Sequence, residues 1–197
     1  LLVRLGCEVH DCGIVPDNRE ATIKVMQDAA AGNDLIVSTA GVSVGEEDHV
    51  KPAVEQLGEL NLWKISMKPG KPFAFGKVRR EAGGSAHFMG LPGNPVSSFV
   101  TFLMMVRPFL LRLQGAEHVT SRALYAPANF DLNKPDARRE FLRVRLNEQG
   151  ALELFGNQSS GVLTSAVWGD GLADNPAMNI VKKGDVVRFI PMSELLQ

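Results

Sequence analysis

The stretch that most constrains the fold runs from Ala86 to Val106. A short apolar run ends at Met89, a turn with two glycines and two prolines follows, and an apolar segment long enough for a helix comes next. This order predicts a strand, a tight loop and a helix that begins at Pro95. Pro95 suits the first helical position because its missing N–H has no helical partner there, and Asn94 is a natural N-cap.

The loop at this strand–helix junction is suited to bind an anion. The first turn of a helix has unpaired backbone N–H groups, its dipole favours negative charge, and glycines let a ligand approach the backbone closely. Ser97 and Ser98 fall in that turn. A loop that only connects a strand to a helix is the alternative, because many α/β loops have a similar composition.

The composition is that of an ordinary globular protein. The chain has 197 residues, of which 45% are hydrophobic and 22% charged, which allows one large domain or two small ones. Its net charge of −1 gives no broad basic face for nucleic acid, and we expect neither a signal peptide nor a membrane-spanning run. Cys7 and Cys12 are interpreted as small core residues of a strand, which favours the reducing cytoplasm, and the scattered histidines predict no zinc site.

Before Gly115 the pattern predicts alternating strands and helices. Leu1–Gly6 is expected to be the end of a helix, and the chain a fragment of a longer protein because it begins without methionine. Asp17 is expected to cap the next helix, with Glu20 as its capping-box partner. Strands are predicted over 8–15, 34–39, 60–67, 73–78 and 86–89, and helices over 17–32, 46–57 and 95–114, the last kinked at Pro108.

After Gly115 the pattern changes to short alternating runs that glycines separate. This predicts a small all-β module, either a sandwich or a barrel. Four arginines lie around its first long strand, and alternation places Arg139, Arg143 and Arg145 on one face and Arg138 on the other. A solvated strand edge is the expected role for most of them.

Two further loops follow predicted strands and carry residues of a functional type. After the glycine-punctuated loop 41–45, Glu46 and Glu47 are expected to cap a helix, whereas Asp48 is equally suited to hold Mg²⁺. Lys68 and Lys71 flank a Pro-Gly pair, and two such ammonium groups repel each other by about 1 kcal/mol unless an anion lies between them. Two solvated lysines are the alternative, but such loops gather at the carboxyl ends of α/β strands, where ligands bind.

The three loops together resemble one enzyme family, the molybdopterin molybdenumtransferases, that is, the bacterial MoeA family to which the plant Cnx1 and gephyrin E-domains are related. The motifs are Gly41-Val-Ser-Val-Gly45-Glu-Glu-Asp48, Lys68-Pro-Gly-Lys71-Pro-Phe-Ala-Phe-Gly76 and Gly90-Leu-Pro-Gly-Asn-Pro-Val-Ser-Ser98. The resemblance implies a molybdopterin-binding-like three-layer α/β domain over residues 1–115, with a mostly parallel mixed sheet whose first strand is missing. A small all-β barrel domain is implied over residues 119–197.

The same resemblance implies a reaction and the residues that perform it. Molybdate is inserted into adenylylated molybdopterin, AMP is released, and Mg²⁺ held by Asp48 assists. The implied molybdate-binding residues are Lys68, Lys71, Ser97, Arg138 and Ser160, and the implied catalytic residues are Asp48, Lys68, Lys71 and Ser97. The implied substrate-binding residues are Gly41, Val42, Ser43, Gly45, Gly90, Pro92, Gly93, Asn94, Pro95 and Ser98. A cytoplasmic homodimer that receives its substrate from a molybdopterin adenylyltransferase is also implied, and the fragment alone is expected to be poorly active.

Two alternatives of other classes remain at this point. A molybdopterin adenylyltransferase shares the α/β fold but usually lacks the β tail and the Lys-Pro-Gly-Lys loop. A gephyrin-like scaffold would bind a partner peptide and would not turn over a substrate. Ala40 stands where the family usually has another glycine, and we expect the extra methyl group to be tolerated.

Overall fold

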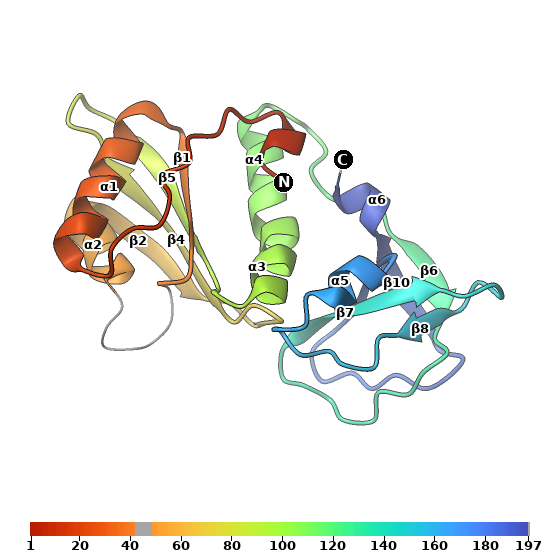
Figure 1. Cartoon of the computed structure of the whole chain (residues 1–197). Helices are drawn as coiled ribbons and strands as arrows, with labels where there is room; N and C mark the ends of the chain where they lie inside the picture. Colours follow the sequence, from red (N-terminus) through yellow and green to blue (C-terminus); the bar gives the residue numbers. More distant parts are fainter. Residues whose placement is uncertain (42–48, 197) are drawn as a thin grey trace. The chain divides into compact units, whose positions relative to one another are not determined.

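The computed structural model describes residues 1–41 and 49–196 (Figure 1). Its internal contacts divide the chain into two compact units. The α/β unit comprises Glu8–Ile65 and Gly70–Asn94, and the C-terminal unit comprises Leu1–Cys7, Ser66–Pro69 and Pro95–Gln197. The domain boundary between residues 115 and 119 stays a prediction.

The α/β unit contains a four-stranded sheet. Its strands lie in the order β1 (Leu35–Thr39), β5 (Ser85–Leu91), β4 (Pro72–Arg79) and β2 (Gly58–Lys64). The sheet is mixed, as predicted, but its neighbours are not mostly parallel: among its described strands only β1 and β5 pair in parallel, whereas β4 runs antiparallel to both of its neighbours, β5 and β2. The reason is the length of the connections: β4 and β5, and β2 and β4, are joined by short loops, and parallel neighbours need a longer crossover.

Two helices pack on this sheet, α1 (Arg19–Gly32) and α2 (Val50–Leu57) (Figure 1). Alternate residues of the strands face the helices because side chains along a strand point to opposite faces. The shared core is small, and its buried members are Met26, Ala30, Ala53, Val54, Ala74, Val78, Ala86 and Phe88.

The N-terminal segment corrects two predictions. Residues 8–15, predicted as a strand, pair with no strand in the described part of the chain, and Cys12 is exposed. The N-cap of α1 is Asn18 and not Asp17: the Asn18 side chain accepts a hydrogen bond of 2.9 Å from the backbone N–H of Ala21. The predicted helix end near Leu1 is confirmed as a 3₁₀ turn, η1 (Val3–Leu5), which Gly6 closes at φ 75°.

The C-terminal unit contains a second sheet, and it is open. Five strands follow the order β3 (Met67–Lys68), β7 (Arg139–Leu146), β9 (Gly171–Asn175), β10 (Val186–Pro191) and β6 (Leu124–Pro127), and β8 (Leu152–Leu154) also pairs with β7. Because β3 and β6 do not pair with each other, the sheet does not close into the predicted barrel. Two short helices, α5 (Thr164–Trp168) and α6 (Met192–Leu195), interrupt the tail predicted to be all-β.

The predicted strand over residues 60–67 is divided between the two sheets. Its first part is β2, and its last residue begins β3, which pairs in parallel with β7 so that Met67 lies opposite Arg139 and Lys68 opposite Glu140. This two-residue strand attaches Lys68 to the C-terminal sheet.

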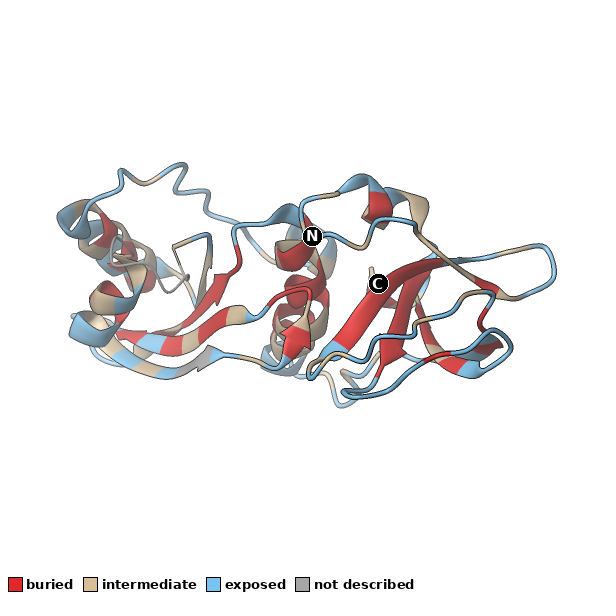
Figure 2. Ribbon diagram, turned by 90° about the horizontal axis from the view of Figure 1, so that it is seen from below, coloured by how far each residue is buried: buried red, intermediate tan, exposed pale blue. Residues whose placement is uncertain are grey.

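The apolar helix begins at Pro95, as predicted, and comprises α3 (Pro95–Thr101), a π-helical turn η2 (Phe102–Val106) and α4 (Arg107–Leu113). The α-helical hydrogen-bond ladder is interrupted near Pro108, which has no backbone N–H to donate. By length and composition alone, Pro95–Leu113 would be long and apolar enough to cross a membrane, with a mean hydropathy of 1.5. Half of this stretch is buried, and core helices pass the same test of length and composition. Figure 2 shows buried residues in this helix and in the strands, whereas the connecting loops are largely exposed.

Candidate functional site

Two of the predicted molybdate ligands, Lys68 and Arg138, lie in one cluster of four charged side chains. Lys68 Nζ is 2.9 Å from Glu140 Oε1 and 3.1 Å from Asp136 Oδ2. Arg138 donates to the same Asp136 carboxylate from Nε and Nη2, at 2.9 Å each. We call Lys68, Asp136, Arg138 and Glu140 the Lys68 cluster.

The pairing of β3 with β7 explains how this cluster forms. Lys68 lies opposite Glu140 in the parallel register, and the backbone N–H of Arg139 donates to Ser66 O at 3.1 Å. Only 4% of the Glu140 side chain is exposed, and its second oxygen accepts a hydrogen bond of 3.2 Å from Asn175 Nδ2. A buried carboxylate needs such partners, so Glu140 fixes the Lys68 ammonium group in place.

The electrostatics favour the charged forms of Lys68, Asp136 and Arg138. The hydrogen bond with Glu140 raises the pKa of Lys68 above its ordinary value, although burial opposes this shift. Hydrogen bonds from Arg138 hold the pKa of Asp136 well below its ordinary value. The exposed fractions of Lys68 and Arg138 are 42% and 34%, so a soluble anion can reach both cations.

The two predicted serines of the molybdate site lie on segments that hydrogen-bond to each other. Ser97 is buried in the first turn of α3, and the backbone N–H of its neighbour Val96 donates to Ser160 O at 3.1 Å. One of the unpaired N–H groups expected to attract an anion is therefore satisfied by the protein itself.

Arg143 holds the loop that carries Ser160, and its position corrects the prediction of a solvated strand edge. Its side chain is 1% exposed, Nε donates to Ser165 Oγ at 3.1 Å, and Nη2 donates to Ser159 O at 3.3 Å. Burial lowers the pKa of Arg143 to about 10. The Gln158 side chain binds both the N–H and the C=O of Arg143, at 3.0 Å each.

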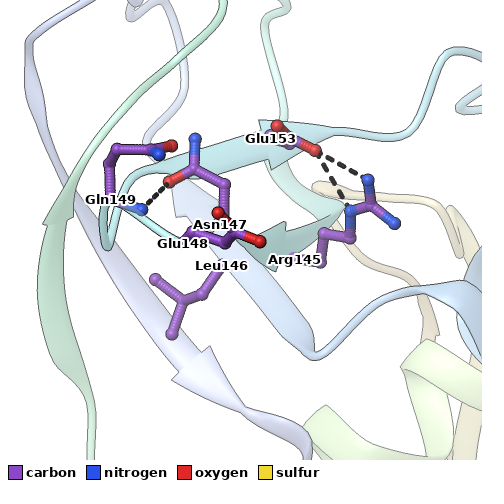
Figure 3. A pocket seen from close by; sticks show the side chains of 6 residues that line it. All are labelled: Arg145, Leu146, Asn147, Glu148, Gln149 and Glu153. Atoms are coloured by element: carbon purple, nitrogen blue, oxygen red, sulfur yellow. Dashed lines mark hydrogen bonds and ion pairs between the residues drawn. The ribbon is translucent and has the colours of Figure 1, made fainter.

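The other two arginines on this face of β7 are also paired. Arg139 donates twice to the buried Asp174, at 2.6 Å each, and Arg145 pairs with Glu153. Arg145 and Glu153 line a pocket that Figure 3 shows, together with Leu146, Asn147, Glu148 and Gln149. This pocket contains none of the predicted site residues.

In the α/β unit, two of the predicted loops start side by side at the carboxyl ends of the parallel pair β1 and β5. The backbone N–H of Ala40 donates to Leu91 O at 3.1 Å, and Ala40 and Gly41 both have left-handed backbones, with φ of 68° and 72°. A Cβ atom on Gly93 would lie 3.2 Å from Ala40 Cβ, so only glycine fits there comfortably. Pro92 is buried, while Gly93 and Asn94 are exposed.

Lys71 also belongs to the α/β unit, where it is exposed. Its carbonyl accepts a hydrogen bond of 3.1 Å from the backbone N–H of Ile65, which closes the loop between β2 and β4. The role of Lys71 next to Lys68 stays a prediction.

Part of the predicted site lies outside the described residues. Val42, Ser43, Gly45 and Asp48 fall in the range 42–48. In the ranges 1–41 and 49–196, no group of three or more His, Cys, Asp or Glu side chains is arranged to hold a metal ion.

Sequence reasoning missed Asp136, Glu140 and Arg143. Asp136 accepts a hydrogen bond of 3.0 Å from the backbone N–H of Arg138, two residues on, and this local turn is a signal that the sequence contains. Glu140 has no such signal, because its partner Lys68 is 72 residues away along the chain. The burial of Arg143 depends on the strands and the loop around it.

Comparison with known proteins matches most of the chain to two family models. Residues 1–112 match the family described as "Probable molybdopterin binding domain", and residues 125–192 match the MoeA C-terminal region (domain IV). The chain is 39% identical over 205 residues to a molybdopterin molybdenumtransferase of Haemophilus influenzae, covering all of this chain and 49% of that protein. It is 33% identical over 168 residues to the enzyme of the same name from Synechococcus elongatus, covering 84% of this chain and 40% of that protein.

A solved structure agrees with these sequence matches. A crystal structure of the molybdopterin biosynthesis MoeA protein from Pyrococcus horikosii superimposes with a TM-score of 0.72 at 27% identity, over 91% of this chain and 42% of that chain. The chain spans half or less of the length of these relatives. Its two family matches and its identity to these relatives show that the chain belongs to the MoeA family of molybdopterin molybdenumtransferases.

Proposed function

We propose that the full-length protein inserts molybdate into adenylylated molybdopterin and releases AMP, and that the Lys68 cluster is part of its molybdate site. The observation that carries this proposal is the convergence of two cations, Lys68 and Arg138, on one carboxylate of the C-terminal unit. A dianionic oxyanion needs fixed positive charge and several donors, and the fork of an arginine suits its oxygens.

The remaining residues of the proposed molybdate site are Ser97, Ser160 and Lys71. The hydrogen bond between Val96 and Ser160 links the segments of the two serines, and Arg143 holds the Ser160 loop against β7. The loop that begins at Gly41 and the loop 90–98 are proposed to bind the adenylylated pterin through backbone donors.

Mg²⁺ enters this proposal through Asp48, which lies outside the described residues. When bound, a divalent ion would neutralise charge on the phosphoanhydride that is cleaved. None of the described residues is assigned to the ion. A cytoplasmic homodimer and a molybdopterin adenylyltransferase that supplies the substrate complete the proposal.

The match of residues 125–192 to the MoeA C-terminal region favours this function over that of an adenylyltransferase, which usually lacks such a tail. No described feature favours a scaffold role in particular.

Arg138 gives the sharpest test. Arg138→Gln in the full-length protein removes the charge, while its partner Asp136 remains partly exposed to water. Charge-assisted hydrogen bonds contribute about 1.5–3 kcal/mol each, so the dissociation constant for molybdate should rise at least about ten-fold in calorimetric titration. Lys71→Ala should act in the same direction, and binding of the adenylylated pterin should change much less.

Arg145→Gln is the matched control, because it makes the same substitution on β7 and removes a surface pair with Glu153. It should leave molybdate binding unchanged. Lys68 is a poorer probe, since its loss would leave the buried Glu140 without a cation. A folded Arg138→Gln protein with the dissociation constant of wild type would put the molybdate site elsewhere.

A further inference from the structure

The Asp136 carboxylate uses the donors of both cations that the proposed function assigns to molybdate. Its Oδ2 accepts from Lys68 Nζ at 3.1 Å and from Arg138 Nη2 at 2.9 Å. Its Oδ1 accepts from Arg138 Nε at 2.9 Å and from the backbone N–H of Arg138 at 3.0 Å. The Asp136 carboxylate therefore already occupies the two donors of the Arg138 fork. An incoming oxyanion would need these same donors.

We infer that Asp136 is an internal competitor of the substrate, and that molybdate binds by displacing this carboxylate from Arg138 and Lys68. This inference rests on the proposed function, because it takes these two cations as molybdate ligands. It assigns Asp136 a role in affinity and specificity that differs from the role of a ligand.

The two carboxylates of the Lys68 cluster differ in their freedom to move. Glu140 is buried within β7 and is also held by Asn175, so it remains beside Lys68. Asp136 lies in the loop before β7, and its side chain is 21% exposed. The Asp136 carbonyl accepts a hydrogen bond of 2.7 Å from the backbone N–H of Met178, so the side chain can rotate away while the loop stays anchored.

The charge balance gives this displacement a selective effect. The Lys68 cluster carries two cations and two carboxylates, so it is neutral while Asp136 is in place. A monoanion such as chloride that displaces Asp136 replaces one negative charge with another, whereas a dianion adds a second negative charge next to Lys68 and Arg138. Both kinds of anion must overcome the same cost of displacing Asp136, so the more weakly attracted monoanion is left with little net affinity and does not fill the site at the concentrations found in cells.

The test is calorimetric titration of sodium molybdate into full-length wild type and the Asp136→Asn variant. Asparagine keeps the shape and can still accept the backbone hydrogen bond from Arg138, but it has no charge. We expect molybdate to bind at least about ten-fold more tightly to the variant at low chloride. We also expect added chloride to weaken molybdate binding to the variant more than to wild type.

Asp28→Asn is the control for net charge, because Asp28 forms an exposed pair with Lys24 on α1. It should bind molybdate like wild type. Asp136→Ala is the second variant and should also bind more tightly, since it removes the amide that could still contact Arg138. Thermal melting checks that each variant is folded.

The outcomes separate this inference from the proposed function. If Arg138→Gln weakens molybdate binding but both Asp136 variants bind no more tightly than wild type, Asp136 positions the cations and the competitor role is wrong. If Arg138→Gln has no effect, the site itself is misassigned and the inference fails with it. Weaker binding in Arg138→Gln together with tighter binding in both Asp136 variants supports both.

Discussion

At the scale of single residues, Ala40 holds a backbone conformation that alanine rarely adopts. Its φ is 68°, and its N–H donates a hydrogen bond to Leu91 O. The left-handed conformation costs a residue with a Cβ about 1–2 kcal/mol, and glycine avoids most of this cost. We expect Ala40→Gly to raise the free energy of unfolding by about 0.5–1 kcal/mol, measured by urea denaturation.

Ala31 provides the control of opposite sign. It is exposed in the last turn of α1, where glycine is less favourable than alanine by up to about 1 kcal/mol, so Ala31→Gly should lower the free energy of unfolding. If both variants lost stability equally, the strain assigned to Ala40 would be absent.

At the scale of elements, the attachment of the Ser160 loop to β7 depends on a buried cation. In the described residues, the Arg143 side chain bonds to Ser165 Oγ and Ser159 O and to no carboxylate. Arg143→Lys keeps the charge but cannot reach both acceptors, so we expect it to lower the free energy of unfolding by about 2–4 kcal/mol. Arg143→Met removes the buried charge and should cost less than Arg143→Lys, because desolvation then no longer opposes folding.

Urea denaturation of the two variants shows directly which of them has the lower free energy of unfolding. A lysine variant more stable than the methionine variant would mean that water reaches this position. In both variants the Ser160 loop should be more mobile, with faster amide hydrogen exchange at Ser159 and Ser160 than in wild type.

At the scale of the whole molecule, two groups with lowered pKa values contribute to the loss of stability in acid. The pKa of His87 is lowered from its ordinary 6.5, first by burial and next by the charges of Lys77 and Arg80. As the pH falls, the histidine of the unfolded chain therefore takes up a proton before that of the folded chain does. Stability should therefore fall as the pH drops below about 6.5. The pKa of Asp136 is lowered from 3.8 by Arg138, so its contribution is present above about pH 4 and is lost as the pH falls further.

The two falls in stability, below about pH 6.5 and below about pH 4, are tested by urea midpoints measured between pH 8 and pH 3. His87→Gln should flatten the upper step, and Asp136→Asn should flatten the lower one. On the alkaline side the sign is reversed for Lys68: its raised pKa stabilises the fold fully below about pH 10.5 and less as the pH rises beyond. Unchanged acid steps in both variants would contradict these assignments.

Local signals predicted much of the secondary structure and little of how the strands pair. The start of the long helix at Pro95, the end of α1 at Gly32 and the strand β4 depend on neighbours in sequence, and each is confirmed. Strand direction, the open second sheet and the unpaired segment 8–15 depend on partners far along the chain. A strand is stable only where a neighbouring strand takes up its backbone hydrogen bonds, and no local pattern reports that neighbour.

The same distinction applies to the candidate site. The sequence by itself determined the family, the cationic loop at Lys68 and the arginine that precedes β7, because these are properties of residue type and spacing. Only the tertiary structure decided that Lys68 pairs with Glu140, that Asp136 lies between the two cations, and that Arg143 is buried. Each of these depends on the register of β3 against β7 or on the packing of the loop around Ser160, and burial and charge pairing arise only once distant segments have met.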